Sequence, residues 1–330
     1  MKVTIKDVAK AAGVSASTVS RALHNNNRIS PEVRARVQRI AQEMDFHPNQ
    51  MARSLVSRQT RIIGVVFPDN VSMNLGNPFY PSVLQGLGHA ASERRYHLLL
   101  ITGSSTLSSE EASRQAVESG YVSGLVYLTA QNRPIGDDSV PSVVIGHPME
   151  KRFSVDNNNV QAGYDATMHL IRNGHRRILL MGFDARYMFT VDRREGYEKA
   201  LSESGIAVQQ SWILPSRPMQ ENIETLRLLF LSPPAPTGVV CMDDAQAIAL
   251  SHQLSEIGLK VPQDVSLIGF NNTEASRYHH PPLTTFDTEP YQLGVHAMNL
   301  MLDILQGNVT DPLSIDVPFR FIQRQSVQTI

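Results

Sequence analysis

The amino-terminal stretch of residues 3–23 constrains the fold more than any other part of this 330-residue chain. Its apolar residues recur at the i, i+3, i+4, i+7 spacing of one helix face. Gly13 then interrupts the pattern with a tight turn, and Ser15 is placed to cap a second helix. The side chains that this second helix leaves pointing outward are Ala16, Ser17, Ser20 and Arg21. We therefore predict a helix-turn-helix whose outward face enters a DNA major groove.

A third helix is predicted from Pro31 onward. Ser30 is a suitable cap, Pro31 fits the first helical position, and Glu32 lies near the positive end of the helix dipole. An apolar stripe follows at Val33, Val37, Ile40, Ala41 and Met44. Three short helices around one small core are typical of a DNA-binding headpiece.

Charge is distributed unevenly along the chain. Residues 1–60 hold ten Lys/Arg and four Asp/Glu, whereas the remaining 270 residues hold twenty and twenty-seven. A basic amino-terminal segment followed by an acidic remainder fits a headpiece that gains affinity from DNA phosphates. Four hydroxyl residues near the predicted helix ends suit either phosphate contacts or simple capping, and both readings stay open: Thr4, Ser15, Thr18 and Ser20.

Composition excludes several classes of protein. No apolar run reaches the length of a membrane span, and the amino terminus has no signal-peptide core, so we expect a cytoplasmic protein without membrane contact. The single cysteine, Cys241, excludes an internal disulfide and lies in an apolar run typical of a buried strand.

After residue 60 the sequence alternates between two patterns. Short apolar runs predict strands at 62–67, 98–102, 124–128, 142–146, 178–182, 238–242 and 265–270. Apolar spacing of 3.6 residues predicts helices at 81–94, 110–119, 160–172, 193–203, 223–231 and 245–257. Such alternation indicates parallel sheets covered on both faces, and the length favours two sheets over one.

The loops after these strands contain the candidate ligand-binding residues. Open parallel sheets bind ligands at the carboxyl ends of their strands. Phe79 and Tyr80 end the loop after the first strand, and Asp243, Asn271 and Asp287 follow later strands. Carboxylates, amides and aromatic faces suit the hydroxyls and ring of a carbohydrate, so we predict a polar, uncharged ligand.

The segments TIKDVAKAAGVS, STVSRAL, RISPEVRARV and HPNQMARSLVSRQT resemble the amino-terminal domain of the lactose-repressor (LacI/GalR) family of bacterial regulators. Later segments, among them HPPLTT at 280–285, extend the resemblance over nearly the whole chain. It implies an all-α helix-turn-helix headpiece plus an α/β, two-lobed, periplasmic-binding-protein-like regulatory core with parallel sheets.

The resemblance also implies a division into domains. Residues 1–46 would form the headpiece, residues 47–60 a hinge helix and linker, and residues 61–330 the effector-binding and dimerisation domain. Within that domain, one lobe would span about 61–159 and 290–318. The other lobe would span about 160–289 and 319–330.

For the headpiece, the resemblance places Ala16, Ser17 and Arg21 against base edges, where Arg21 suits guanine. The segment 49–56 is too short for a stable isolated helix, so it should order only when covered, unless it is a plain linker. In the family, this hinge helix pairs with its twin in the minor groove of a pseudo-palindromic double-stranded DNA operator. Its matching residues here are Asn49, Ala52 and Leu55, with Leu55 as the wedge between base pairs.

For the core, Arg193-x-x-Gly196 resembles the family's effector-binding arginine motif. Many members carry an acid where this chain has Asn271, which leaves the identity of the sugar open. The segment NPFYPSVLQG most resembles the maltose-operon repressors, so a maltose-type glucoside is preferred. The resemblance implies a homodimer, and nothing in the sequence calls for a cofactor or metal.

Three alternatives remain beside a sugar-responsive repressor. A family member can instead respond to a phosphorylated carrier protein. An enzyme is less favoured, because the sequence lacks H-E-x-x-H, P-loop and G-x-S-x-G motifs, and His279-His280 fits a loop better than a metal site. A transport-type sugar-binding protein would need a secretion signal and has no use for a helix-turn-helix.

Overall fold

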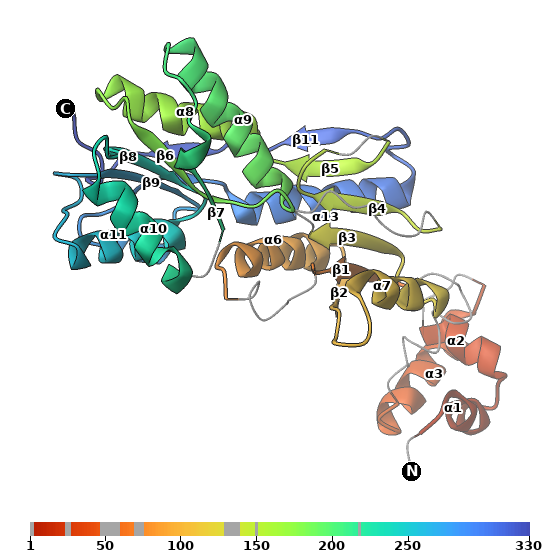
Figure 1. Ribbon diagram of the computed structural model, residues 1–330. Coiled ribbons are helices and arrows are strands. Elements are labelled where there is room, and N and C mark those ends of the chain that lie inside the picture. Colours follow the sequence, from red (N-terminus) through yellow and green to blue (C-terminus); the bar gives the residue numbers. More distant parts are fainter. Residues whose placement is uncertain are drawn as a thin grey trace. The chain divides into compact units, whose positions relative to one another are not determined.

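The structure is a computed structural model that describes residues 3–23, 28–46, 60–68, 76–128, 139–148, 151–216 and 219–330 (Figure 1). The chain divides into two compact units, Met1–Thr60 and Arg61–Ile330.

The first unit contains the three predicted helices, α1 (Ile5–Ala12), α2 (Ala16–Leu23) and α3 (Pro31–Glu43). Gly13 ends α1 in the left-handed conformation with φ of 65°, which a residue without a Cβ adopts at little cost. The side chains of Val8, Val19 and Val37 are fully buried, one from each helix. The helix-turn-helix and the third helix are therefore confirmed.

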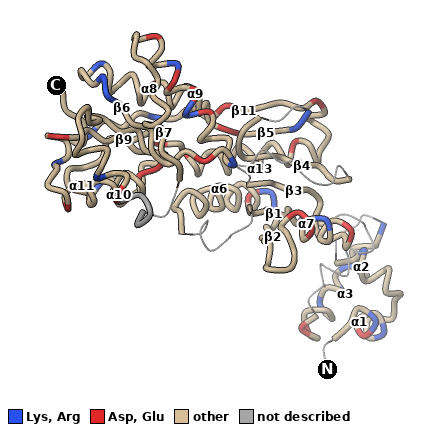
Figure 2. Tube along the Cα trace, viewed as in Figure 1, with Lys and Arg blue, Asp and Glu red and all other residues tan. Residues whose placement is uncertain are grey.

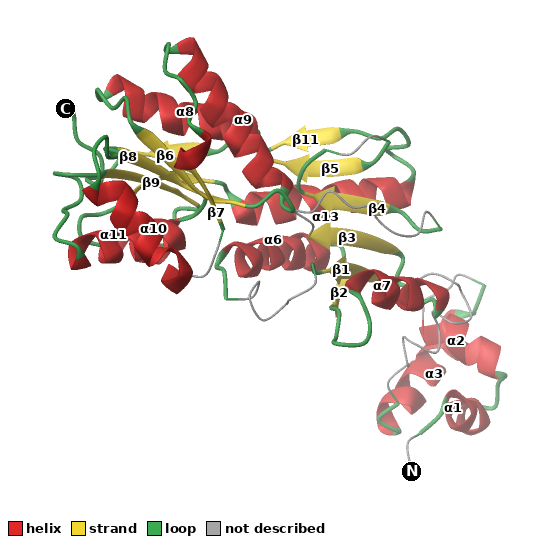
Figure 3. Ribbon diagram, in the orientation of Figure 1, coloured by secondary structure: helices red, strands yellow, loops and turns green. Residues whose placement is uncertain are grey.

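The second unit contains two six-stranded sheets (Figure 3). The first has the strand order β11-β5-β4-β3-β1-β2, and its strands are all parallel. They comprise β1 (Ile62–Val66), β2 (His97–Ile101), β3 (Gly124–Leu128), β4 (Ser142–Ile145), β5 (Phe153–Asp156) and β11 (Ser314–Asp316). Helices α6 (Phe79–Glu93) and α13 (Pro290–Gln306) pack on one face and α7 (Ser109–Glu118) on the other.

The second sheet has the order β12-β10-β9-β8-β6-β7, with β12 antiparallel to β10. Its strands are β6 (Ile178–Phe183), β7 (Ile213–Pro215), β8 (Gly238–Cys241), β9 (Ser266–Phe270), β10 (Thr284–Asp287) and β12 (Arg320–Ile322). Helices α8 (Asn159–Arg172) and α9 (Met188–Glu203) cover one face. Helices α10 (Met219–Leu231) and α11 (Asp244–Glu256) cover the other, and the short α12 (Glu274–Tyr278) follows β9.

All seven predicted strands and all six predicted core helices are present, so the two-lobed parallel architecture is confirmed. Helix α9 begins at Met188, five residues before the predicted start at Arg193. The chain passes between the sheets three times, after β5, after β10 and after β11. No helix in the described part of the chain is long and apolar enough to cross a membrane.

Candidate effector site and DNA-binding surface

A cavity of about 380 Å³ lies between the two lobes and is lined by residues from both sheets. Several strands of each sheet end beside it, which is where the sequence placed the candidate ligand-binding residues. Five of the six predicted effector residues line it: Phe79, Tyr80, Arg193, Asp243 and Asn271. Its size falls within the ~300–1,000 Å³ typical of small-molecule sites.

Asp287, the sixth predicted residue, does not line the cavity, and this part of the prediction is wrong. Its carboxylate accepts hydrogen bonds from Asn272 Nδ2 at 2.9 Å, Arg320 Nη2 at 3.2 Å and the Glu289 amide at 3.0 Å. These bonds hold the turn behind the site. The next residue, Thr288, lines the cavity instead.

Arg193 is the buried cation of the site, with only 5% of its surface exposed. Its Nε donates to Asn159 Oδ1 at 3.0 Å and its Nη1 to the Met242 carbonyl at 2.6 Å. The guanidinium carbon lies 3.9 Å from the centroid of the Phe270 ring, a cation–π contact. Burial lowers the pKa of Arg193 to about 10, against the opposing effect of nearby carboxylates such as Asp243. Arg193 is therefore held rigidly and stays charged at neutral pH.

Asp243 and Asn271 are fixed by their backbone positions. Asp243 caps α11 and accepts from the Gln246 amide at 2.7 Å, while burial raises the pKa of its carboxyl. Asn271 has a φ of 93°, a left-handed conformation that asparagine tolerates better than most residues. Its side-chain oxygen accepts from the Thr288 hydroxyl at 3.2 Å.

Two aromatic residues enter the cavity from the start of α6. The rings of Phe79 and Tyr80 meet edge to face with centroids 5.4 Å apart. Burial, followed by the charge of Tyr187 across the cavity, raises the pKa of Tyr80 to about 12. Tyr187 belongs to the other lobe, so the two tyrosines line the cavity from different lobes.

The structure adds polar residues that the sequence did not single out. Asp156 lines the cavity, and burial raises its pKa to about 7. His147 Nδ1 lies 2.9 Å from Asp192 Oδ2, which links the first lobe to α9 of the second. Asp156 ends β5, a short strand without the apolar run that marked the others. Only recognition of that strand would have pointed to it.

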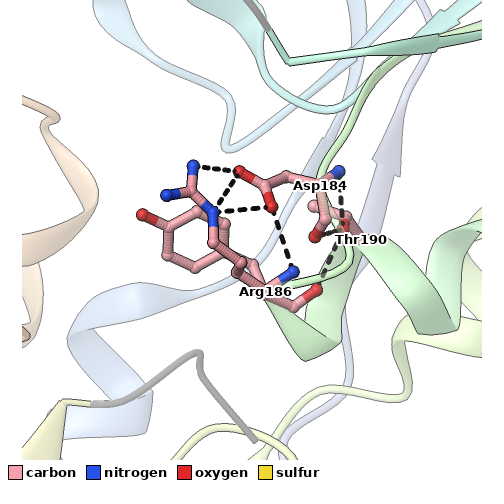
Figure 4. A network of polar contacts seen from close by, with 4 residues as sticks. Asp184, Arg186 and Thr190 are labelled. Carbon is pink, nitrogen blue, oxygen red and sulfur yellow. Dashed lines mark hydrogen bonds and ion pairs between the residues drawn. The ribbon is translucent and has the colours of Figure 1, made fainter.

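Asp184 also lines the cavity, in the turn between β6 and α9 (Figure 4). Its carboxylate accepts from Arg186 Nη2 at 2.6 Å, from Nε at 3.0 and 3.1 Å, and from the Arg186 amide at 3.0 Å. The buried Thr190 hydroxyl donates to the Asp184 carbonyl at 2.6 Å. The turn is thus tied to the first residues of α9.

On the headpiece, Lys and Arg occur on all three helices (Figure 2). Ser17 and Arg21 are exposed on α2, as the outward face requires. Ala16 is half-buried and packs against the headpiece core, so its predicted outward orientation is only partly right. The predicted hinge residues Asn49, Ala52 and Leu55 lie outside the described residues.

Among the hydroxyl residues of the headpiece, Thr4 and Ser15 take capping positions, whereas Thr18 and Ser20 lie inside α2. Thr4 Oγ1 donates to Asp7 Oδ2 at 2.7 Å, and Ser15 Oγ accepts from the Thr18 amide at 3.1 Å. Thr18 Oγ1 lies 2.9 Å from Ser15 Oγ. Capping does not occupy every lone pair of a hydroxyl, so a phosphate contact stays compatible with this geometry.

Comparison with known proteins identifies both units. Residues 4–49 match the family described as bacterial regulatory proteins, lacI family. Residues 167–327 match the periplasmic binding protein-like domain. The regulator MalR of Streptococcus pneumoniae is 34% identical over 319 residues, covering 93% of this chain and 94% of that protein. The ribose operon repressor of Haemophilus influenzae is 31% identical, covering 92% of each.

Solved structures agree over nearly the whole length. The regulator CelR in complex with cellobiose has 27% identity and a TM-score of 0.74, covering 98% of this chain and 100% of that one. The lac repressor dimer bound to operator and an anti-inducer has a TM-score of 0.83 over 99% of this chain, and at 24% identity this likeness concerns the fold. The chain belongs to the lacI family of bacterial regulatory proteins and is a DNA-binding transcriptional regulator.

Proposed function

We propose that this regulator is a repressor whose operator affinity is controlled by a neutral sugar bound between its lobes, with a maltose-type glucoside preferred. The observation that carries the proposal is the charge and shape of the cavity. Among the residues that the structure describes, three aspartates line it, Asp156, Asp184 and Asp243, against one arginine, Arg193. An anionic ligand would meet this acidic lining, whereas the hydroxyls of a neutral sugar donate to it and accept from Arg193.

The names of related proteins support a glucoside. MalR is 34% identical to this chain, and CelR was solved with cellobiose, a disaccharide. The rings of Phe79, Tyr80 and Tyr187 also line the cavity and offer the apolar faces on which sugar rings pack. Asp156, Arg193, Asp243 and Asn271 offer the polar contacts.

In the proposed mechanism the protein is a homodimer and has no catalytic role. Two headpieces read the half-sites of a pseudo-palindromic operator through the outward face of α2, with Ser17 and Arg21 nearest the bases and Thr4, Ser15, Thr18 and Ser20 near phosphates. Residues 47–60 form the hinge, with Asn49, Ala52 and Leu55 at the minor groove. Sugar binding changes how the two lobes close on one another, and the His147–Asp192 pair is a contact between the lobes that this movement would alter.

The test measures sugar binding and operator retention in the same preparation. We expect maltose to bind and to change retention on selected genomic fragments, and glucose 6-phosphate to bind at least tenfold more weakly, about 1.4 kcal/mol. Arg193→Ala should remove the response, because hydrogen bonds to charged groups contribute about 1.5–3 kcal/mol.

Arg194→Ala is the matched control, since Arg194 pairs with Glu198 at 2.7 Å and does not line the cavity. An unaltered response in Arg193→Ala would remove Arg193 from the site. Retention that ignores every sugar but responds to a phosphorylated carrier protein would replace the proposal with that alternative. Chemical conversion of the sugar would instead support the alternative that the protein is an enzyme.

A further inference from the structure

The turn that joins β6 to α9 places a carboxylate and an aromatic ring together on one wall of the cavity. Asp184 and Tyr187 both line it, only three positions apart. The Asp184 amide donates to Thr190 Oγ1 at 3.2 Å, and the Tyr187 amide donates to the Asp184 carbonyl at 2.9 Å. Because Thr190 is 1% exposed and lies on α9, the turn is anchored to the same helix that carries Arg193.

Arg186 holds the carboxylate of Asp184 in one orientation. The guanidinium and the amide of Arg186 donate to both oxygens, and these hydrogen bonds lower the pKa of Asp184. The Arg186 side chain is 74% exposed, whereas that of Asp184 is 13% exposed. Figure 4 shows the guanidinium beside the carboxylate at the turn. Arg186 therefore reaches over Asp184 from solvent and leaves it an ionised acceptor at the edge of the cavity.

This wall differs from the part of the cavity around Arg193. There the groups are deeply buried: Arg193 and Asn159 are each 5% exposed, and Arg193 donates to Asn159 and to Met242. At the turn, Tyr187 is only half-buried and carries the exposed Arg186 guanidinium 5.7 Å above its ring. Tyr80, from the other lobe, lines the same cavity. The cavity thus has a deeply buried inner region around Arg193 and an outer region at the turn that carries Asp184 and Tyr187.

We propose that Asp184, positioned by Arg186, and Tyr187 form an outer subsite that binds the second ring of a disaccharide and selects it over a monosaccharide. This inference rests on the proposed sugar response and names which part of the sugar the turn recognises. The Arg186 amide, Nε and Nη2 occupy three of the about four acceptor positions of the Asp184 carboxylate, which leaves one lone pair for a sugar hydroxyl. The adjacent aromatic ring of Tyr187 covers the apolar face of the sugar. Arg186 acts through Asp184 and is a positioning residue.

The test compares maltose and glucose on the full-length chain, with calorimetry for maltose and displacement of bound maltose for glucose. Asp184→Asn and Arg186→Ala should each weaken maltose binding by about tenfold to a hundredfold, since charge-assisted bonds are the stronger class. Glucose binding should change by less than about twofold, because one ring fits the inner region alone. Arg194→Ala, on the same helix but outside the cavity, should change neither.

A double-mutant cycle separates positioning from general support of the fold. If Arg186 acts only through Asp184, the double variant Asp184→Asn/Arg186→Ala binds maltose no more weakly than Asp184→Asn alone. Arg186→Lys should recover part of the affinity, because an ammonium donates to the carboxylate without the planar fork. Melting temperatures of all variants serve as the check on folding.

Two results would overturn the subsite while leaving the sugar response intact. One is an equal loss of glucose and maltose affinity in Asp184→Asn, and the other is a strictly additive cycle. Failure of the wild-type chain to bind either sugar would instead contradict the proposed function, and the subsite with it. These outcomes are distinguishable because the wild-type titration is read first.

Discussion

Arg193 and Asp156 are both buried in this cavity, yet burial affects their charges differently: Arg193 stays charged at neutral pH, whereas Asp156 titrates near it. Burying an unpaired ion costs several kcal/mol, so a buried charge needs partners. Arg193 has two hydrogen-bond acceptors, an aromatic face and neighbouring carboxylates, and remains charged. Asp156 lies in the same surroundings with fewer donors, and burial raises its pKa to about 7. The site therefore holds a fixed cation and a carboxyl that titrates near neutral pH.

This raised pKa predicts a pH dependence of stability. Asp156 has an ordinary pKa of 3.8 when unfolded and about 7 when folded, so the folded state binds more protons between these values. The free energy of unfolding should therefore fall as pH rises from about 4 to 7, at roughly 1.4 kcal/mol per unit at most. Asp156→Asn removes the titration, and the variant should gain stability relative to the wild type between pH 5 and 8.

Urea unfolding at pH 5, 6, 7 and 8 measures the difference. The control is Asp316→Asn, because Asp316 faces Asp156 in the register of β11 with β5 but is exposed. A constant gap between wild type and Asp156→Asn at all four pH values would refute the raised pKa.

At the scale of elements, the sequence predicted the strands that are apolar throughout. The apolar runs did not include β10, the strand expected before Asp287, because its residues Thr284 and Thr285 are buried although polar. Thr285 donates to Asp244 Oδ1 at 2.6 Å, and Thr284 Oγ1 accepts from the Arg324 amide at 3.0 Å. Such a strand is stabilised by side-chain partners that lie about 40 residues away, and no local pattern reveals them.

Site residues that follow strongly apolar strands could be located from the sequence. Asp243 and Asn271 follow strongly apolar strands, so the rule for parallel sheets located them. Asp156 follows β5, which carries no such signal, and Asp184 stands in a turn whose hydrogen bonds depend on Thr190. Asp287 also ends a strand, yet its carboxylate is used by the neighbouring turn. Position at a strand end predicts proximity to the cavity but not the direction of the side chain.

Helix α9 offers a test of how an element positions the site. It packs on α8 through two glycines: a Cβ at Gly196 would lie 2.0 Å from the Val160 carbonyl oxygen, and one at Gly163 2.2 Å from that of Arg193. Gly196→Ala should therefore push α9 away from α8 and shift Arg193. We expect a loss of about 1–3 kcal/mol in stability, with weaker sugar binding at temperatures where the protein is folded.

The matched control is Gly88→Ala in α6, where the nearest atom to the new Cβ is 3.9 Å away. Alanine is the better helix former by about 0.8–1 kcal/mol, so this variant should be as stable as the wild type or more so. Thermal unfolding and maltose titration of both variants give the comparison. If Gly196→Ala binds sugar as well as Gly88→Ala does, the spacing of the two helices does not position Arg193.

At the scale of the whole molecule, regulation requires that the core influence the headpiece. The core's two sheets exchange strands, because β11 and β12 come from the last part of the chain yet belong to different lobes. The three segments that connect the lobes, after β5, β10 and β11, must therefore all change when the lobes move relative to one another. The headpiece is a separate unit with its own small core, and residues 47–60 join it to the first strand. The effect of the bound ligand on operator affinity must therefore be transmitted through residues 47–60 or through the arrangement of the dimer.

Leu55 tests this connection most directly. The segment 49–56 is too short to be a stable isolated helix, so we expect it to order between its twin and the operator, with Leu55 as the wedge. Leu55→Ala keeps every charge of the segment and should lower operator affinity by about tenfold or more, because the wedge supports the bend that brings protein and DNA together. Sugar affinity measured without operator should stay within about twofold, because the coupling between the two sites acts only when both ligands are present. Replacing residues 46–60 with a glycine-serine tether should reduce operator binding further and remove the sugar response. Gel retention against a non-specific duplex, with maltose titration of the same samples, measures both quantities. Operator binding that is unchanged in both variants would show that the headpieces bind without a structured hinge.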